Sequence, residues 1–432
     1  MPELVQLLFA FSAFSLFATL ILAIGLAVKA AAMEAEQEFA AYTPEELALA
    51  DGGAEDGLPL VSVIVPARNE ERNLGPCLEG ILGFDYPNLE VLLVDDESSD
   101  RTGELSRAAA EADPRVQAIE LKSLPEREPR EGYPSGKVYV LAEAARLAKG
   151  EWLLFLDADT RQQPAGLRRA LTYARRHGLR AFSASGLYPN PGFWGEIAEA
   201  TIYVAVFFAI PLRAVNDPAR RDVGWANGQF VLIERRAYDE IGGHRALKPF
   251  ATEDLALGRL LKEREIPYRF LPGAALYTCI NYVGLAEAHA GWVRLIAQAG
   301  PWLQLRRSFF GLAAFYLLAA GVLPFLTLPA VACGLIPNVG VGPLSLLALA
   351  AAQVALALLI QSENRRAMRL PLWRSLLLPV GALLGLRTLF ASYRARFSVG
   401  GYTWRGRSFT LDDPQALGAP EAETDPRQEG AA

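Results

Sequence analysis

The chain has long apolar runs at both ends and a central region in which short apolar and polar segments alternate. Residues 4–28 carry no charge, so they can cross the hydrocarbon core of a bilayer as one helix. The run exceeds a signal-peptide core and no basic segment precedes it, so we predict a retained transmembrane anchor over residues 1–30. Residues 31–58 are acidic and rich in alanine, which predicts a solvated linker.

The second apolar region predicts membrane segments over residues 309–393. It contains the runs Phe309–Ile336, Leu344–Ile360 and Leu370–Tyr393. Before it, residues 276–308 mix tryptophan with arginine, which is typical of a helix in the membrane interface.

The arginines around the third run conflict with a simple crossing. Both Arg365–Arg374 and the basic start of the tail, residues 394–432, should be cytosolic. If the third run crosses the membrane once, these two arginine-rich segments lie on opposite sides of the membrane and cannot both be cytosolic. Either the third run, interrupted at Pro379, is re-entrant or interfacial, or the first run, broken at Pro324, behaves unusually. The tail becomes acidic and is expected to be disordered from about residue 412.

The central region, residues 59–275, predicts an α/β domain. Short apolar strands at residues 60–65, 90–94, 116–119 and 152–156 alternate with helical segments. This alternation implies a parallel sheet covered on both faces. Ligands of such sheets bind beyond the carboxyl ends of the strands.

Acidic residues follow two of these strands directly. Asp157 and Asp159 leave a strand at positions i and i+2, where two carboxylates can hold a hard cation. Capping of the next helix is the competing interpretation. Asp95 and Asp96 can accept hydrogen bonds from a nucleoside, although aspartates are also common in turns.

Two further motifs stand at predicted helix starts. Thr252-Glu253-Asp254 offers Asp254 as a general base with Glu253 beside it. Alone, the triplet is a plain helix N-terminus, with threonine as the cap. Lys137 follows Gly136 at the start of a helix, where a lysine can meet phosphate.

The order of these motifs resembles family 2 glycosyltransferases, which have the GT-A fold. The motifs are Pro66-Ala-Arg-Asn-Glu70, Asp95-Asp96, Gly136-Lys137, Asp157-Ala-Asp159, Asn227-Gly-Gln229, Gly242-Gly-His244 and Thr252-Glu-Asp254. The resemblance implies an inverting mechanism in which Asp254 deprotonates the acceptor. It implies Mg²⁺ or Mn²⁺ held by Asp159 with Asp157. It assigns nucleotide-sugar binding to Pro66, Arg68, Glu70, Asp95, Asp96, Lys137, Asp157, Asn227 and Gly228.

Within this family the chain is similar to enzymes that glycosylate carotenoids and hopanoid-type lipids. It shares with them Asn227–Ile233 and a late Trp404-Arg405-Gly-Arg407. The residues Trp404, Arg405 and Arg407 are assigned to the donor diphosphate or to lipid head groups, with a basic membrane anchor as the alternative. Those relatives often have Arg-Met-Tyr where this chain has Cys279-Ile-Asn281-Tyr282. The missing arginine removes support for carrying over any role at that position.

The resemblance implies transfer of a hexose, with UDP-glucose as the expected donor, to a hydroxyl or carboxyl of a membrane lipid such as a carotenoid. A processive polysaccharide synthase is an alternative, but Gln304-Leu-Arg-Arg307 lacks the tryptophan of the processive motif. A non-catalytic membrane scaffold is the second alternative. We expect a multi-pass protein of the cell membrane with a cytosolic catalytic domain.

Composition narrows the expected partners. The net charge of -6 gives no support to nucleic-acid binding. The three cysteines lie far apart in the sequence, which argues for reduced thiols. The expected partners are therefore a nucleotide-sugar, a lipid acceptor and the bilayer.

Overall fold

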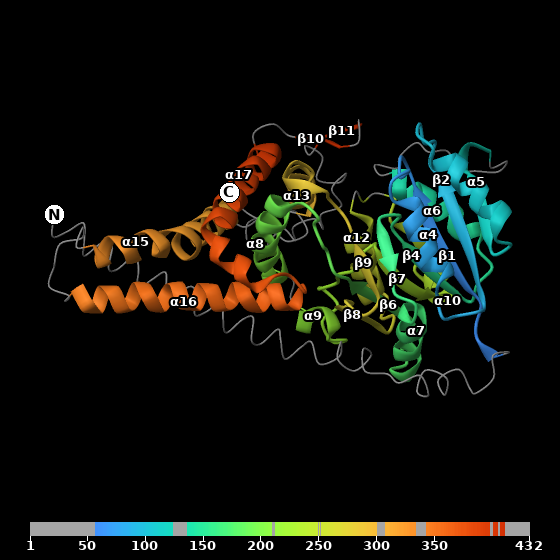
Figure 1. The fold of residues 1–432 in the computed structure, drawn as a ribbon. Coiled ribbons are helices and arrows are strands. Elements are labelled where there is room, and N and C mark those ends of the chain that lie inside the picture. The colour runs from blue at the N-terminus through green and yellow to red at the C-terminus, as the bar shows by residue number, and fades with distance from the viewer. Residues whose placement is uncertain are drawn as a thin grey trace, which may run out of the picture.

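The computed structural model describes residues 57–123, 136–209, 212–248, 250, 252–299, 307–333, 343–397, 401–404 and 407–410. The predicted anchor, the linker up to residue 56 and the tail from residue 411 lie outside these residues. An α/β domain and a group of long helices lie side by side (Figure 1).

The α/β domain is built on a seven-stranded sheet with the order β3-β2-β1-β4-β7-β6-β8. The strands β1, β2 and β4 form from short runs rich in β-branched residues or leucine, and these central strands are buried on both faces. The strands are β1 Val61–Ala67, β2 Leu89–Asp95, β3 Val116–Glu120, β4 Trp152–Leu156, β6 Ala181–Ser185, β7 Phe230–Glu234 and β8 Tyr268–Pro272.

The sheet is parallel at the four predicted strands but not at β7, which was not predicted as a strand. Strands β1 to β4 are parallel to one another where they pair, but β7 is antiparallel to both β4 and β6. After β6 the chain leaves the sheet through two helices, α8 and α9, instead of a crossover helix on the sheet face. The chain therefore re-enters the sheet at the same end at which β6 left it, and β7 runs antiparallel to β6.

Helices cover both faces of the sheet, as the strand–helix alternation predicts. One face packs against α4 Leu74–Leu82, α5 Thr102–Ala112 and α7 Gly166–Arg176. The other packs against α6 Gly136–Leu147, α10 Arg235–Glu240, α11 Gly243–Ala246 and α12 Glu253–Glu263. A separate antiparallel pair, β5 Thr160–Gln162 with β9 Tyr277–Cys279, lies next to the end of β4.

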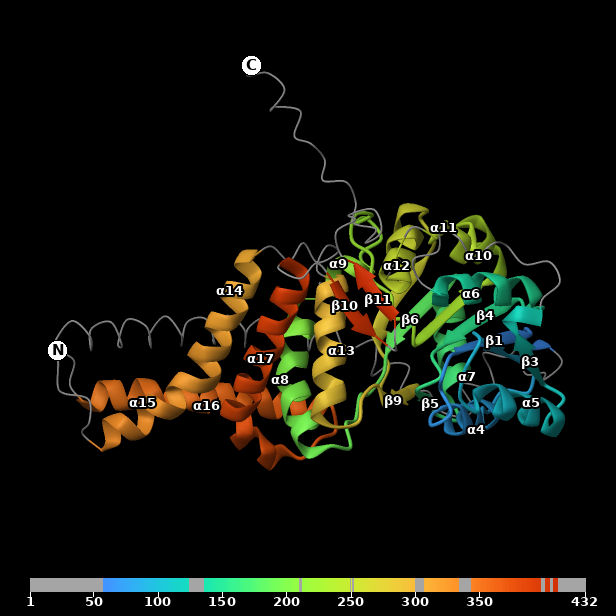
Figure 2. The same cartoon turned by 90° about the horizontal axis from the view of Figure 1, so that it is seen from above.

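The remaining helices form the second part of the molecule. Helices α8, α13 and α17 pack together beside the α/β domain, and α15 and α16 extend away from it (Figures 1 and 2). The elements are α8 Phe193–Ala209, α9 Leu212–Asn216, α13 Gly284–Ala299, α14 Arg307–Tyr316, the π-helix η3 Leu317–Val322, α15 Leu323–Ala332, α16 Pro343–Ala367, the 3-10 helix η4 Leu372–Leu377, α17 Leu378–Phe397, and the hairpin β10 Gly401–Trp404 with β11 Arg407–Thr410.

The three predicted apolar runs are helical. Among the described residues, three helical stretches are long and apolar enough to cross a membrane: Arg307–Ala332, Leu347–Ala367 and Leu372–Phe397. Pro379 falls in the first turn of α17, where no intrahelical donor is lost, so it starts this helix instead of breaking it.

A buried ion cluster joins α8 to the apolar helices. Glu196 of α8 binds Arg365 of α16 at 2.6 Å and Arg374 of η4 at 2.5 Å. Arg365 is almost fully buried, with 1% of its side chain exposed. An arginine at this depth requires a partner, so the cluster fixes the register of the helices against α8.

Candidate active site

The carboxylates of Asp157 and Asp159 emerge beyond β4, a central strand of the sheet. Both are partly exposed, whereas Ala158 between them is buried. The chain turns at these residues, where the Thr160 amide donates to the Asp157 backbone oxygen at 3.2 Å. Both carboxylates lie near the Cys279 thiol, because burial and the charges of Asp159 and Asp157 raise the pKa of that thiol. Carboxylate oxygens are the ligands that Mg²⁺ and Mn²⁺ prefer, so these residues fit a hard divalent cation.

Lys137, at the start of α6, connects two acidic segments. Its Nζ lies 2.6 Å from Asp157 Oδ1 and 2.8 Å from Glu253 Oε1. Burial alone would lower the pKa of Lys137, but the charges of Asp157, Glu253 and Asp254 raise it above its ordinary value. Lys137 therefore stays protonated and places a fixed positive charge beside Asp157.

Asp254 lies in the first turn of α12 and is held by two backbone amides. The Gly228 amide donates to Asp254 Oδ2 at 3.3 Å, and the Leu255 amide donates to Oδ1 at 2.9 Å. Burial and the neighbouring Glu253 raise the pKa of Asp254 to about 6. A carboxylate with this pKa is ionised at neutral pH and is more basic than an exposed aspartate.

Glu253 has a different environment from its neighbour. Burial would raise its pKa, but the ammonium group of Lys137 lowers the pKa below the ordinary value. Glu253 is therefore ionised and paired with Lys137. The charge of Lys137 also acts on Asp254, but of the two acids only Glu253 forms an ion pair with the lysine in the part of the chain that the structure describes.

Thr252 precedes this helix without capping it through its side chain. The Thr252 hydroxyl makes no cap hydrogen bond, whereas Asp254 accepts the Leu255 amide itself. The helix start was predicted correctly, with Thr252 at the N-cap position and both acids in the first turn, but the threonine hydroxyl does not make the expected cap hydrogen bond.

Asp159 is held by a polar network of residues that lie far from it in the sequence. The Cys279 thiol lies 3.1 Å from Asp159 Oδ1 and 2.9 Å from Asn281 Oδ1. Gln229 Nε2 donates to Asn281 Oδ1 at 2.7 Å and to Cys279 Sγ at 3.2 Å. The pairing of β5 with β9 brings Cys279 opposite Thr160, next to Asp159 in the chain.

Asn227 links this network to the sheet and to α8. Its Nδ2 donates to the Tyr188 hydroxyl at 2.7 Å, and its Oδ1 accepts the Gln229 amide at 3.1 Å. Tyr188 in turn stacks on Tyr203 of α8, with 5.3 Å between the ring centroids. The loop Asn227–Gln229 is therefore fixed from both sides.

A second group of predicted residues gathers at the ends of β1 and β2. Arg68 Nη1 donates to the backbone oxygen of Asp96 at 2.8 Å and lies 3.4 Å from its carboxylate. Asp95 accepts the Ser98 amide, which is turn chemistry. Glu70 binds Asn73 at 2.9 Å, and Pro66 lies within β1. The structure places these residues at the same edge of the sheet as Asp157.

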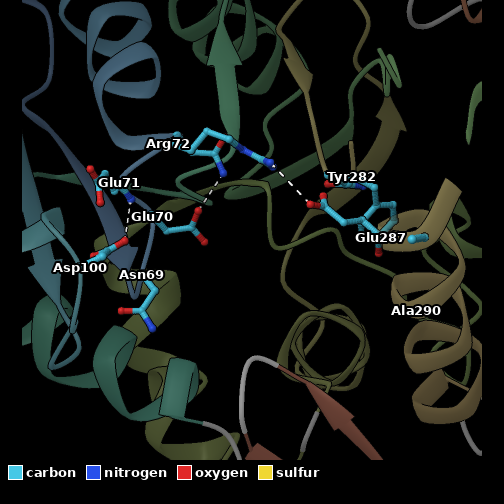
Figure 3. Close-up of a pocket in the computed structure, with 11 residues that line it drawn as sticks. Asn69, Glu70, Glu71, Arg72, Asp100, Tyr282, Glu287 and Ala290 are labelled. Atoms are coloured by element: carbon cyan, nitrogen blue, oxygen red, sulfur yellow. Dashed lines mark hydrogen bonds and ion pairs between the residues drawn. The ribbon is translucent and has the colours of Figure 1, made fainter. Parts of the chain in front are cut away.

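A cavity of about 940 Å³ lies between the α/β domain and α13. Figure 3 shows the segment Asn69–Arg72 facing Tyr282, Glu287 and Ala290 across it. Arg72 and Glu287 approach to 3.7 Å and bridge its two walls. Asn281 also lines the cavity, so the cavity adjoins the network around Asp159.

The predicted residues fall into three sets. Lys137, Asp157, Gly228, Glu253 and Asp254 form one cluster, and Asp159 and Asn227 adjoin it through the Cys279–Gln229 network. The residues at the ends of β1 and β2 form the second set. The third comprises Arg405, which lies outside the described residues, and Trp404 and Arg407, whose strands are described without their side chains.

Sequence reasoning missed the residues that support these sets. Gln229, Cys279 and Tyr188 were assigned no role, although Gln229 belongs to the Asn227-Gly-Gln motif. Cys279 and Asn281 stand where the chain departs from the family pattern, and that departure was the available signal.

The described residues contain no group of three His, Cys, Asp or Glu side chains arranged to hold a metal ion by themselves. Asp157 and Asp159 supply carboxylate oxygens but do not complete a coordination shell. A divalent cation here would take its remaining ligands from water or from a bound phosphate, as Mg²⁺ usually does.

Comparison with known proteins gives a family match over more than half of the chain. Residues 59–295 match the family described as "Glycosyltransferase like family 2". The chain is 29% identical over 205 residues to the Beta-monoglucosyldiacylglycerol synthase of Trichormus variabilis, covering 46% of this chain and 40% of that protein. It is 22% identical over 250 residues to the 4,4'-diaponeurosporenoate glycosyltransferase of Staphylococcus aureus, covering 54% and 60%. The aligned part therefore spans less than two thirds of either relative.

Among solved structures, the mannosyltransferase PcManGT from Pyrobaculum calidifontis in complex with GDP-Man and Mn²⁺ aligns at 20% identity, covering 88% of this chain and 99% of that one. Its TM-score is 0.42, which is too low to support an inference about this chain.

Proposed function

The chain belongs to the family 2-like glycosyltransferases, and on that premise we propose that it transfers a hexose from a nucleotide-sugar to a membrane lipid. Family membership confirms the expected class of enzyme, a glycosyltransferase with the GT-A fold. We propose UDP-glucose as the donor, a lipid hydroxyl or carboxyl as the acceptor, and inversion at the anomeric carbon.

The arrangement around Asp254 carries this proposal. A single-displacement transfer needs one base beside the acceptor and a cationic surface beside the leaving diphosphate. Asp254 is basic, ionised at neutral pH and fixed by the amides of Gly228 and Leu255. Lys137 lies in the same cluster, between Asp157 and Glu253.

In the proposed reaction, the acceptor oxygen attacks the anomeric carbon on the face opposite the diphosphate. A carbon–oxygen bond to the acceptor forms as the bond to the phosphate oxygen breaks, and that electron pair leaves with the diphosphate. Asp254 takes the proton when the acceptor is a hydroxyl. Lys137 stays protonated and stabilises the negative charge that grows on the leaving group.

Asp157 and Asp159 would hold Mg²⁺ or Mn²⁺, which when bound neutralises the diphosphate. The Cys279 thiol, which contacts both Asp159 and Asn281, would orient Asp159 for this task. Arg68 and Asp96 would contact the nucleoside, and Glu70 and Asp95 would border its pocket. Lys137 is paired with Asp157, so binding of a cation by Asp157 would rearrange this pair.

The lipid acceptor is proposed from the helices beside the site and from the relatives. Both named relatives are glycosyltransferases whose names contain a lipid or carotenoid substrate or product. In this chain the cavity next to Asp159 has one wall on α13, which packs against α8 and α17. An acceptor arriving from the helical side would therefore reach the end of the sheet where Asp254 lies.

The test supplies radiolabelled UDP-glucose and other nucleotide-sugars to membranes that contain the protein, with lipid extracts as acceptors. We expect one labelled lipid, carrying a single hexose with inverted anomeric configuration by NMR. Asp222→Asn, an exposed acid paired with Arg220, is the matched control and should transfer normally. No labelled lipid from any donor would contradict the proposal, and a labelled polymer would favour the polysaccharide synthase instead.

A further inference from the structure

The cavity between the α/β domain and α13 has two walls of different chemistry, which face each other in Figure 3. The wall on the α/β side is polar and consists of Asn69–Asn73 with Asp100. The opposite wall holds Tyr282 and two exposed alanines, Ala286 and Ala290, which lie one helical turn apart on α13. A cavity with one polar and one apolar wall fits an amphiphilic ligand, whose hydrocarbon part is favourably buried against the alanines.

The charged residues of this lining are mostly acids. Among the described residues that line the cavity, four are acidic and one is basic: Glu70, Glu71, Asp100, Glu287 and Arg72. The Arg72 guanidinium faces Glu287, 3.7 Å from its Oε1. Asp100 accepts hydrogen bonds from the Thr102 hydroxyl and the Glu71 amide, which are neutral groups and leave its negative charge in place. An anionic ligand would therefore meet net negative charge in this cavity.

Two further arginines lie near the lining residues without reversing this charge. Arg101 lies 3.8 Å from Glu71 but only 3.0 Å from Glu104, and 62% of its side chain is exposed to solvent. Arg161 donates to Asn73 Oδ1 at 3.3 Å but is not one of the lining residues. Even if both arginines are counted with Arg72, the acids of the lining outnumber them.

The position of Asp254 favours the same kind of acceptor. A hydroxyl must lose its proton as it attacks, whereas the oxygen of an ionised carboxylate or phosphate has no proton to lose. Asp254 is held in place by the amides of Gly228 and Leu255. A fixed base of this kind serves a hydroxyl acceptor and would have no task with an anionic one.

We propose that this cavity binds the acceptor and selects a lipid with an uncharged hydroxyl over one with a carboxylate or a phosphate. The apolar part of the acceptor lies along Ala286 and Ala290. Its hydroxyl points toward Asn281, whose Oδ1 belongs to the network around Asp159. The lining acids repel the wrong acceptors, since like charges brought together in a site disfavour binding. The selection rests on the proposed function and narrows its acceptor from a hydroxyl or carboxyl to an uncharged hydroxyl.

Protection of a cysteine placed in the cavity measures this selection without catalysis. Ala290→Cys in a Cys333→Ser background provides the probe, because the other two native cysteines, Cys77 and Cys279, are buried. The full-length protein in a neutral detergent is labelled with N-ethylmaleimide in the presence of hexadecylglycerol, hexadecanoate or hexadecyl phosphate, which share one chain length. Leu295→Cys, exposed on α13 outside the lining, is the matched control for effects of the detergent micelle.

We expect hexadecylglycerol to slow the labelling of Ala290→Cys but not that of Leu295→Cys. The two anionic amphiphiles should need concentrations about 10-fold higher or more for the same protection. Glu71→Gln combined with Glu287→Gln removes two acids whose side chains are 44% and 49% exposed, so the buried core is left untouched. In this double variant the difference between neutral and anionic amphiphiles should shrink to about 3-fold or less.

Equal protection by the neutral and the anionic amphiphiles would overturn the selection. Protection by none of them would show that the cavity does not hold the acceptor, and an unchanged difference in the double variant would remove the acids as its cause. Transfer of labelled hexose to lipid extracts reports the proposed function separately. Labelled lipid together with equal protection would leave the transferase assignment standing and refute the selection, whereas selective protection without any labelled lipid would count against the transferase assignment alone.

Discussion

The amide of Gly228 donates a hydrogen bond to Asp254, with 3.3 Å between Gly228 N and Asp254 Oδ2. The lack of a side chain at residue 228 makes room for this contact, because a Cβ there would lie 3.0 Å from Lys137 Nζ and 3.5 Å from Asp254 Cβ. The loop after Asn227 can thus approach the base and the lysine together.

Gly228→Ala should therefore lower kcat while leaving the fold intact. The added methyl displaces the Lys137 ammonium group by a few tenths of an ångström, and misplacement of about 1 Å at a reactive centre can cost about 100-fold. We expect a loss of about 10-fold or more in steady-state transfer. Gly75→Ala is the control, since a Cβ at that helical position meets nothing within 4 Å. Unchanged turnover in Gly228→Ala would show that this close approach has no catalytic role.

The pH dependence of transfer should report Asp254. Its pKa is raised to about 6 by burial and by Glu253, and only the ionised form can accept a proton. With a hydroxyl acceptor, kcat/KM should be constant at neutral pH and fall as the pH decreases through about 6. The measurement is a pH–rate profile between about pH 5 and about pH 8, a range that brackets the pKa of this carboxyl group. A flat profile across that window would count against Asp254 as the base.

Cys279 should act on the metal through Asp159. Its thiol lies 3.1 Å from Asp159 Oδ1, and removal of such an outer-shell partner typically weakens metal affinity by about 10- to 100-fold. Cys279→Ala should raise the Mn²⁺ concentration needed for half-maximal activity, and Cys279→Ser, which keeps a donor, should restore part of the affinity. Direct Mn²⁺ binding by electron paramagnetic resonance measures this apart from turnover. Cys333→Ala, at an exposed position, is the control, and equal Mn²⁺ affinity in all three variants would refute the role.

Glu196 should stabilise the attachment of the apolar helices. Glu196→Ala leaves Arg365 buried without its carboxylate, and breaking a buried pair in this way costs about 3–5 kcal/mol. We expect a clearly lower midpoint of thermal unfolding in detergent. Glu363→Ala removes the partner of Arg366 in an exposed pair and should change the midpoint little. Equal midpoints for the two variants would mean that the buried cluster does not hold the helices.

The sequence predicted the four strands β1 to β4 because these are short apolar runs, but it did not predict β6, β7 or β8 as strands. The run Trp152–Leu156 became β4 with the same bounds, and the acids after it lie at the carboxyl end, as the rule for such sheets requires. The antiparallel direction of β7 could not be predicted from the sequence, because it depends on where the chain re-enters the sheet and not on the composition of Phe230–Glu234.

The supporting contacts of the site could not be predicted for a related reason. Cys279 meets Asp159 across a separation of 120 residues, and that contact exists only because β5 pairs with β9. No local pattern encodes such a pairing. The cluster of Lys137, Glu253 and Asp254 was anticipated only through the family resemblance, since each motif alone also fits an ordinary helix start.

The central claim is that Asp254 is the base of a glycosyl transfer. The most direct test compares Asp254→Asn with Asp159→Ala in two assays, transfer of labelled hexose to lipid and Mn²⁺-dependent binding of the nucleotide-sugar. We predict that Asp254→Asn lowers transfer by about 100- to 10,000-fold but binds donor normally, whereas Asp159→Ala loses both. Normal transfer by Asp254→Asn would contradict the account.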